Sequence, residues 1–174
     1  MKQRRNATIA YLLITGMMVL FSGCRNKTVK PPYDLNGNTT DCISIPYDEQ
    51  DGVKTIPVKI NGITMNMIYD TGCSGVHLSL NEVQTLAKNG KLAQEDILGA
   101  SYATIADGSI VQNGMINIRT IEIGDKENQI TLENIQASVA LNQMAPILLG
   151  NTVLDELASV EVDNIGKTIN FHKK

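Results

Sequence analysis

The sequence predicts a mostly β fold that contains one or two short helices. Several stretches of the chain alternate apolar and polar residues, as half-buried strands do. Turn-forming pairs such as Asn61-Gly62 separate these stretches and indicate hairpins. Hydrophobic residues make up 43% and charged residues 19% of the 174 residues, a globular mixture that excludes wholesale disorder. At this length we expect one domain with a terminal tail.

The composition also excludes several classes of binding protein. The formal net charge is −3 and no cluster of Lys and Arg occurs beyond residue 30, so nucleic acid is not an expected partner. The chain has no Trp and only 4% aromatic residues, which argues against stacking platforms for bases or sugars. Its three cysteines are too few for a disulfide scaffold and lack the spacing of zinc ligands. We therefore expect no metal and no cofactor.

The first 23 residues resemble a bacterial lipoprotein signal peptide. Basic residues at positions 2, 4 and 5 precede an uncharged stretch, residues 7–21, which is too short for a comfortable membrane span but suits an export signal. Small residues then lead to Cys24, as in the lipobox whose cysteine is lipidated, although Phe21 departs from the usual Leu or Val. The alternative is an ordinary signal peptide or signal anchor with a chance cysteine.

Residues 24–41 are expected to form a polar tether between a lipid anchor and the folded domain, residues 42–174. The tether contains Pro31-Pro32 and little that is apolar. Several acyl chains on Cys24 would make attachment to membrane lipid stable, since one chain alone is marginal. We therefore expect a lipid-anchored protein of the bacterial cell envelope that faces the periplasm.

The first half of the domain should contain three strands and a helix. Ser79 and Glu82 have the spacing of the capping box that begins a helix, and Asn89-Gly90 is a suitable end for it. The charged pair Glu95-Asp96 is expected to lie in a solvated loop. The predicted strands comprise residues 43–46, 55–60 and 63–69.

The second half should be built from strands with one further short helix. A wholly apolar stretch ending at Gly150 indicates a buried strand, and Ala106-Asp107-Gly108 forms a turn between two others. The predicted strands comprise residues 102–105, 109–111, 115–123 (beginning after Gly114), 130–141 as one bent strand or a pair, 147–149, 160–163 and 168–171, with the helix at 151–158.

Asp70, Thr71 and Gly72 follow directly on the predicted strand 63–69, and this is where the chemistry is expected. A strand holds a following carboxylate rigidly, and Gly72 leaves room for a substrate backbone to approach. The tripeptide alone is a weak signal, because Asp and Gly are common at plain strand-to-turn junctions. Its position among the surrounding strands makes it a strong one.

In the order and spacing of these elements, the chain resembles the retropepsin-like aspartic proteases, including their single-domain bacterial members. The resemblance covers about residues 42–171 and implies a small closed β-barrel. Cys73 departs from the Ala that is common in the family. The site residues that the resemblance implies are the catalytic Asp70, the loop-supporting Thr71, Gly72 and Ser74, and the substrate-binding flap residues Ala106, Asp107 and Gly108.

The resemblance also implies a homodimer that hydrolyses a peptide or protein substrate. Aspartic proteases use two carboxylates that share one proton. This chain has one Asp-Thr-Gly, so two chains must each bring Asp70 to a shared two-fold axis, across which Thr71 would reach. Two flaps would cover an extended substrate strand. The implied activity is that of a membrane-tethered aspartic endopeptidase.

Other interpretations stay open at this point. A catalytically inactive relative could use the same barrel to bind peptide or protein. His77 lies four residues after Cys73, the spacing of a possible nucleophilic Cys–His pair, although no third orienting group is evident. Cys42 and Cys73 remain after lipidation of Cys24, and they could form a disulfide or stay as free thiols.

Overall fold

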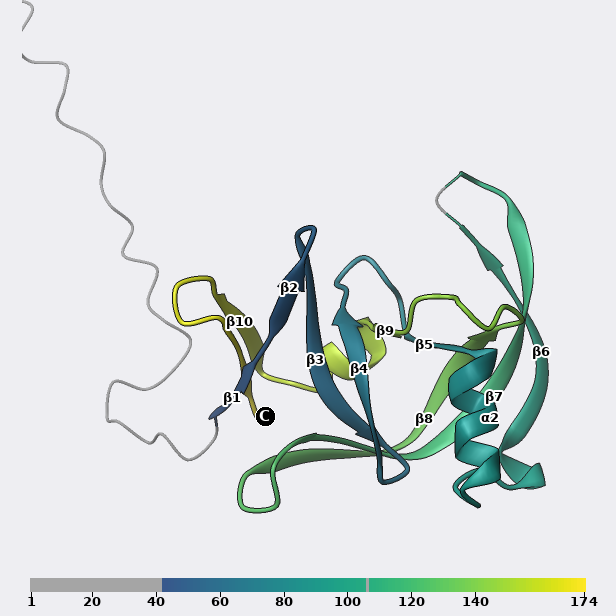
Figure 1. The fold of residues 1–174 in the computed structure, drawn as a ribbon, viewed down its shortest axis with the longest axis horizontal. Helices are drawn as coiled ribbons and strands as arrows, with labels where there is room; N and C mark the ends of the chain where they lie inside the picture. Colours follow the sequence, from purple (N-terminus) through teal and green to yellow (C-terminus); the bar gives the residue numbers. More distant parts are fainter. Residues whose placement is uncertain (1–41, 106) are drawn as a thin grey trace, which may run out of the picture. The chain divides into compact units, whose positions relative to one another are not determined.

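The computed structural model describes residues 42–105 and 107–174, and their strands form two sheets (Figure 1). The strands are β1 (Cys42–Pro46), β2 (Asp48–Gln50), β3 (Val53–Ile60), β4 (Ile63–Tyr69), β5 (Val76–Ser79), β6 (Ile97–Thr104), β7 (Ile110–Gly124), β8 (Gln129–Ala140), β9 (Leu148–Leu149), β10 (Ser159–Asp163) and β11 (Thr168–His172). The helical segments are α2 (Leu80–Lys88), the short 3₁₀ helix η2 (Gln94–Asp96) and α3 (Asn151–Leu154).

The larger sheet closes on itself. Its strand order is β2-β3-β4-β9-β5-β8-β7-β6, and a further pairing joins β3 to β7. Six strands, β3, β4, β9, β5, β8 and β7, therefore form a ring of pairings. Two neighbouring pairs, β4–β9 and β5–β8, run parallel, and the others are antiparallel. This confirms the mostly β class and the closed sheet expected from the sequence.

The β3–β4 hairpin turns at Asn61-Gly62, as expected. Both residues have positive φ, 48° and 84°, which is what the tight hairpin turn requires. The Asn61 side chain also accepts from the Thr120 N–H (3.0 Å) and donates to the Lys91 carbonyl (2.8 Å). The turn is thus fixed to β7 and to the end of α2, and it sets the direction in which β4 leaves.

Helix α2 begins and ends where the sequence indicates. Ser79 is the N-cap, its hydroxyl accepts from the Asn81 N–H (3.1 Å), and the Glu82 carboxylate accepts from the Ser79 N–H (3.2 Å). Asn89 caps the other end. The helix buries Leu86 and packs against β5 and β8.

Three expected boundaries were clearly wrong, and the first is the start of β6, which begins at Ile97 rather than at residue 102. Strand β7 is continuous through Gly114, which pairs with Val139 of β8, so the glycine interrupts nothing. Helix α3 ends at Leu154 rather than at residue 158, because the Ala158 N–H bonds to the His172 carbonyl (2.9 Å) and draws the chain into the sheet of β10 and β11. The segment 130–141 is one strand, β8.

Asp96 was also expected in the wrong environment. It is buried, with 5% of its side chain exposed, and it binds Arg119 of β7 through both carboxylate oxygens (Nε–Oδ1 3.1 Å, Nη2–Oδ2 2.5 Å). The Ala93 N–H also donates to it (2.8 Å). The Arg119 guanidinium lowers the pKa of this carboxyl, and η2 is held to β7 by charge-assisted hydrogen bonds.

The terminal strands form the smaller sheet, in the order β1-β11-β10. Its inward side chains, including Ile43, Ile169 and Phe171, belong to the same buried cluster as the ring residues Ile56, Met67 and Leu149. The start and end of the described domain therefore share one hydrophobic core with the site-bearing strands. No helix in the described part of the chain is long and apolar enough to cross a membrane.

Candidate active site

Asp70 lies at the end of β4, beside the short parallel strand β9. The Ile68 N–H donates to the Ile147 carbonyl (2.9 Å), and the Asp70 N–H donates to the Leu149 carbonyl (3.2 Å). Both residues that precede Asp70 pair with β9, Ile68 with Leu148 and Tyr69 with Leu149. The backbone of Asp70 is therefore fixed by paired strands up to the residue itself.

The loop after β4 turns tightly around the Asp70 carboxylate. The Gly72 N–H donates to Asp70 Oδ1 (2.8 Å), and the Cys73 N–H donates to the Asp70 carbonyl (3.3 Å). A Cβ on Gly72 would lie 3.1 Å from the same Oδ1, which is tighter than ordinary contact. The glycine therefore allows the backbone N–H to approach the carboxylate, and Asp70 itself is half-buried.

A second segment, Gly150 to Thr152, binds this loop through hydrogen bonds to its backbone carbonyls. The Asn151 N–H donates to the Cys73 carbonyl (2.9 Å), and Asn151 Nδ2 donates to the Thr71 carbonyl (3.1 Å). Thr152 donates to the Ser74 carbonyl through its N–H (3.1 Å) and through Oγ1 (2.9 Å). We call these residues the loop staple.

The loop staple requires glycine at its first position. A Cβ on Gly150 would collide with the carbonyl oxygens of Cys73 and Gly75. Gly150 is buried, so the two segments have no room to separate without disturbing the core around Leu149. Sequence reasoning placed Gly150 at the end of an apolar strand and missed its contact with the Asp70 loop.

The other residues of the loop are open to solvent in the single chain. Thr71, Gly72 and Ser74 are all exposed. Ser74 is anchored through its backbone carbonyl, whereas the Asp70 carboxylate accepts a hydrogen bond from the Gly72 N–H. The supporting role expected for the Ser74 hydroxyl stays a prediction.

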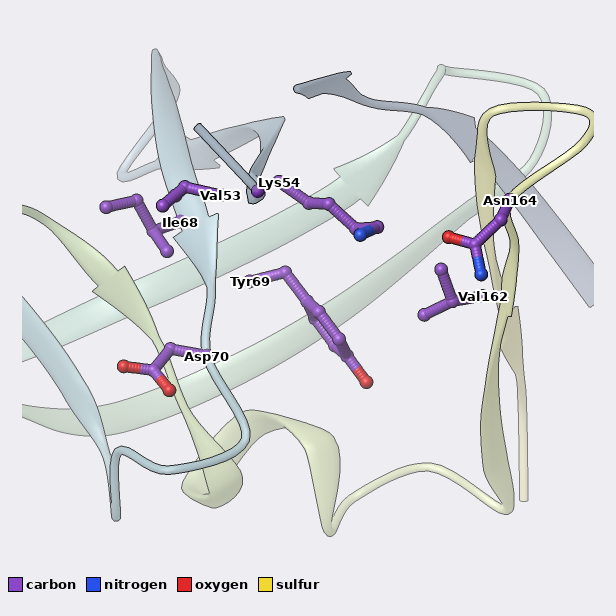
Figure 2. Close-up of a pocket in the computed structure, with 8 residues that line it drawn as sticks. Val53, Lys54, Ile68, Tyr69, Asp70, Val162 and Asn164 are labelled. Carbon is purple, nitrogen blue, oxygen red and sulfur yellow. The ribbon is translucent and has the colours of Figure 1, made fainter. Parts of the chain in front are cut away.

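Asp70 stands at the rim of an open pocket of about 560 Å³ (Figure 2). One side of the pocket is formed by Lys54 of β3 and by Ile68 and Tyr69 of β4. The opposite side is formed by Val162 of β10 and by Asn164 of the following turn. Sequence reasoning did not identify this pocket, because its two sides lie about a hundred residues apart in the chain.

The expected flap is a hairpin between β6 and β7. Asp107 and Gly108 lie in its turn, while Ala106 is outside the described residues. The Ser109 N–H donates to Asp107 Oδ1 (2.8 Å), Gly108 has φ 83°, and hydrogen bonding to Ser109 lowers the pKa of Asp107. In Figure 1 the tip of this hairpin and the loop after β4 lie on the same side of the domain.

The cysteines do not form the alternative site. Cys73 Sγ donates to the Gly75 carbonyl (3.1 Å), whereas His77 Nδ1 bonds to Ser138 Oγ (2.7 Å). Burial lowers the pKa of His77. Cys42 lies beside His172 on β11, and both Cys42 and Cys73 are free thiols. Cys42 and Cys73 therefore form no disulfide with each other. Cys24 lies outside the described residues.

A closed six-strand ring with an Asp-Thr-Gly loop at its strand ends defines the retropepsin-like class of aspartic protease. The family described as "gag-polyprotein putative aspartyl protease" matches residues 56–156, and the chain belongs to this family. The match includes Asp70, its loop and the loop staple.

One of the solved structures that match this chain has the same fold. A retropepsin-like aspartic protease from Rickettsia conorii superposes with a TM-score of 0.53 at 19% identity, over 76% of this chain and 90% of that chain. The protease of EIAV in complex with an inhibitor also matches, with TM-score 0.44, 19% identity, and coverage of 67% and 98%. The retroviral protease-like domain of Ddi1 from Leishmania major matches with TM-score 0.43, 10% identity, and coverage of 75% and 94%. A search of curated proteins found no significant match.

Proposed function

We propose that this protein is an aspartic endopeptidase that works as a homodimer, with Asp70 of each chain forming one catalytic pair. The observation that carries the proposal is the setting of Asp70. Its backbone is held by β9, its carboxylate accepts from the Gly72 N–H, and it borders a pocket. The matched protease family, residues 56–156, includes Asp70, Gly72 and β9, whereas most of the pocket lining lies outside the match.

The chemistry requires two carboxyl groups in different protonation states. The ionised one takes a proton from a water molecule, whose oxygen adds to the scissile carbonyl. The protonated one donates to the carbonyl oxygen, and the proton then available passes to the leaving amine as the C–N bond breaks. Two carboxyl groups held close together share one proton because both cannot be charged at once.

A second chain is the proposed source of the second carboxyl. The sequence contains one Asp-Thr-Gly. The exposure of Thr71, Gly72 and Ser74 in the single chain supports this, because a loop that meets its symmetry mate must be accessible. Two copies of the β6–β7 hairpin would then cover a substrate strand from above.

We further propose that the protein is anchored by lipid on Cys24 and faces the periplasm, with peptide or protein as substrate. The basic start, the uncharged stretch and the small residues before Cys24 support this. A Cys24→Ser variant should move from the membrane fraction to the soluble fraction of the cell envelope. Unchanged membrane association would contradict the lipid anchor and leave the protease proposal untouched.

Digestion of a peptide library by the purified protein tests the activity. Asp70→Asn should lower kcat/KM by at least about a thousandfold, because the amide cannot take a proton from water. Asp155→Asn changes an exposed carboxylate just beyond α3 and should cleave like the wild type. A wild type that binds peptides but cuts none would favour the inactive relative.

A further inference from the structure

We propose that His77 is a specificity-determining residue that selects an uncharged, hydrogen-bonding side chain, such as Asn, of the peptide substrate. This inference rests on the proposed peptidase function and adds the class of side chain that the site prefers. Three observations support it: the side of β4 on which the Asp70 carboxylate lies, the register of the strands next to β4, and the hydrogen bond that holds the His77 ring.

The Asp70 carboxylate lies on one side of β4, and a substrate that reacts with it must bind on that side. Figure 2 shows the side chains of Ile68 and Asp70 on this side of β4 and the side chain of Tyr69 on the other. Residues two positions apart on an extended chain are expected to share a face in this way. Ile68 therefore marks the face of the sheet that a bound peptide would cover.

The register of the strands extends this face from Ile68 to His77. Ile68 pairs with Leu148 of β9, and Leu148 pairs with His77 of β5. His77 in turn pairs with Ser138 of β8. Because residues that pair across a sheet have their side chains on the same face, these four residues form one row, which we call the site row. All four are partly exposed, whereas both neighbours of His77 and both neighbours of Ser138 along their strands are buried.

His77 is close enough to Asp70 to meet a substrate residue near the scissile bond. Neighbouring strands lie about 4.8 Å apart, so two strand spacings place the backbone of His77 about 10 Å from that of Ile68. An extended peptide rises about 3.3 Å per residue, so this distance corresponds to about three residues. A peptide that runs along the site row with its scissile carbonyl at Asp70 would therefore place a flanking side chain over His77.

The imidazole of His77 is held through one nitrogen and would meet the substrate with the other. Its Nδ1 is hydrogen-bonded to Ser138 Oγ at 2.7 Å. Side chains stand roughly perpendicular to a sheet, and Nε2 is farther from the backbone than Nδ1, so Nε2 is the outer nitrogen of this partly exposed ring. An amide side chain both donates and accepts, and it can therefore bond to Nε2 whether or not this nitrogen carries a proton.

The site row has no charge to pair with a charged substrate side chain. Ile68, Leu148 and Ser138 are uncharged, and burial lowers the pKa of His77, so the imidazole is neutral at neutral pH. Removing an ionised side chain from water here would cost free energy without a charged partner to offset it. An amide loses less on leaving water and regains a hydrogen bond at Nε2. The site row therefore favours Asn over Asp.

Peptides that differ at one position flanking the scissile bond test this preference. Each carries Asn, Leu or Asp there, three side chains of similar shape, and kcat/KM is measured near pH 7. At one flanking position or more, the wild type should cut the Asn peptide faster than the Leu and Asp peptides. His77→Leu should lower the ratio of kcat/KM for Asn to that for Leu by about tenfold, because the Asn amide then meets an apolar side chain.

Two further variants separate the hydrogen bond from other effects of substitution. His77→Gln keeps a hydrogen-bonding group on β5 and should keep most of the preference for Asn. His172→Leu makes the same substitution at the other histidine, which lies on β11 beside Cys42 and Glu161, and it should leave the Asn-to-Leu ratio unchanged. Circular dichroism of each variant shows that it is folded.

The outcomes separate this inference from the proposed function. A wild type that cuts no peptide contradicts the peptidase proposal, and binding of the same three peptides to Asp70→Asn, followed by fluorescence anisotropy, still tests the role of His77. A wild type that cuts peptides but prefers Leu or Asp to Asn at every flanking position overturns the role of His77 alone. An equal Asn-to-Leu ratio in the wild type and in folded His77→Leu also overturns it.

Discussion

Asp70 is fixed by contacts that come from two distant segments of the chain. The sequence predicts the contacts that Asp70 makes with its own loop, because a strand followed by Asp-Thr-Gly implies a rigid carboxylate and a close approach of the backbone. It does not predict the loop staple. Asn151 donates to a carbonyl 80 residues earlier in the chain, and no local pattern of Asn or Thr signals such a contact.

The loop staple should be sensitive to any side chain at its first residue. Gly150→Ala places a methyl group against the carbonyl oxygens of Cys73 and Gly75, so the two segments must move apart. We expect a loss of about 1–3 kcal/mol in the free energy of unfolding, measured by denaturant titration. The displaced Asp70 loop should also lower kcat/KM by about tenfold or more.

Gly114→Ala provides the comparison. Gly114 lies within β7, and its Cβ would meet Val139 Cβ at 3.4 Å, close to ordinary contact. This variant should keep most of its stability and activity. Equal effects of the two substitutions would show that the loop staple has no special role in positioning Asp70.

At the level of elements, the parts with strong local signals could be predicted. The Asn61-Gly62 hairpin and the capping box of α2 are where the sequence places them, because each depends on residues a few positions apart. Strand β2 was missed because Asp48, Glu49 and Gln50 are all polar and exposed, which leaves no apolar alternation. The end of α3 depends on a contact with β11, which no local pattern contains.

The η2–β7 connection gives a pH-dependent prediction. Arg119 lowers the pKa of Asp96 in the folded state below its value in the unfolded chain. The ion pair therefore stabilises the fold fully above the unfolded pKa of about 3.9, and this contribution is lost as the pH falls through the folded pKa. Asp96→Asn should lower Tm by several degrees near neutral pH, and the gap to the wild type should close in strong acid.

Glu122→Gln is a suitable control for this measurement, since its ion pair with Lys59 is partly exposed and should contribute little. Differential scanning calorimetry between neutral pH and about pH 2 follows both variants. A gap between Asp96→Asn and the wild type that stays constant down to strong acid would show that the Asp96 carboxylate is not the stabilising group.

At the level of the whole molecule, the ring is closed by contacts that the resemblance implied and local patterns did not. Lys59 and Ile60 of β3 pair with Glu122 and Ile121 of β7, which lie about sixty residues later. The alternation within each strand predicts which face is buried, but it does not name the partner strand. The order and spacing of elements carried that information.

The central claim is that two copies of Asp70 act together, and mixing wild type with Asp70→Asn tests it most directly. The two proteins are combined in varied proportions at constant total concentration, under conditions that let subunits exchange, and peptide cleavage is measured. If each active site needs both carboxyl groups, activity should follow the square of the wild-type fraction, so an equal mixture retains about one quarter of full activity. An equal mixture that retains about one half would mean that each chain acts alone, and it would contradict the shared pair.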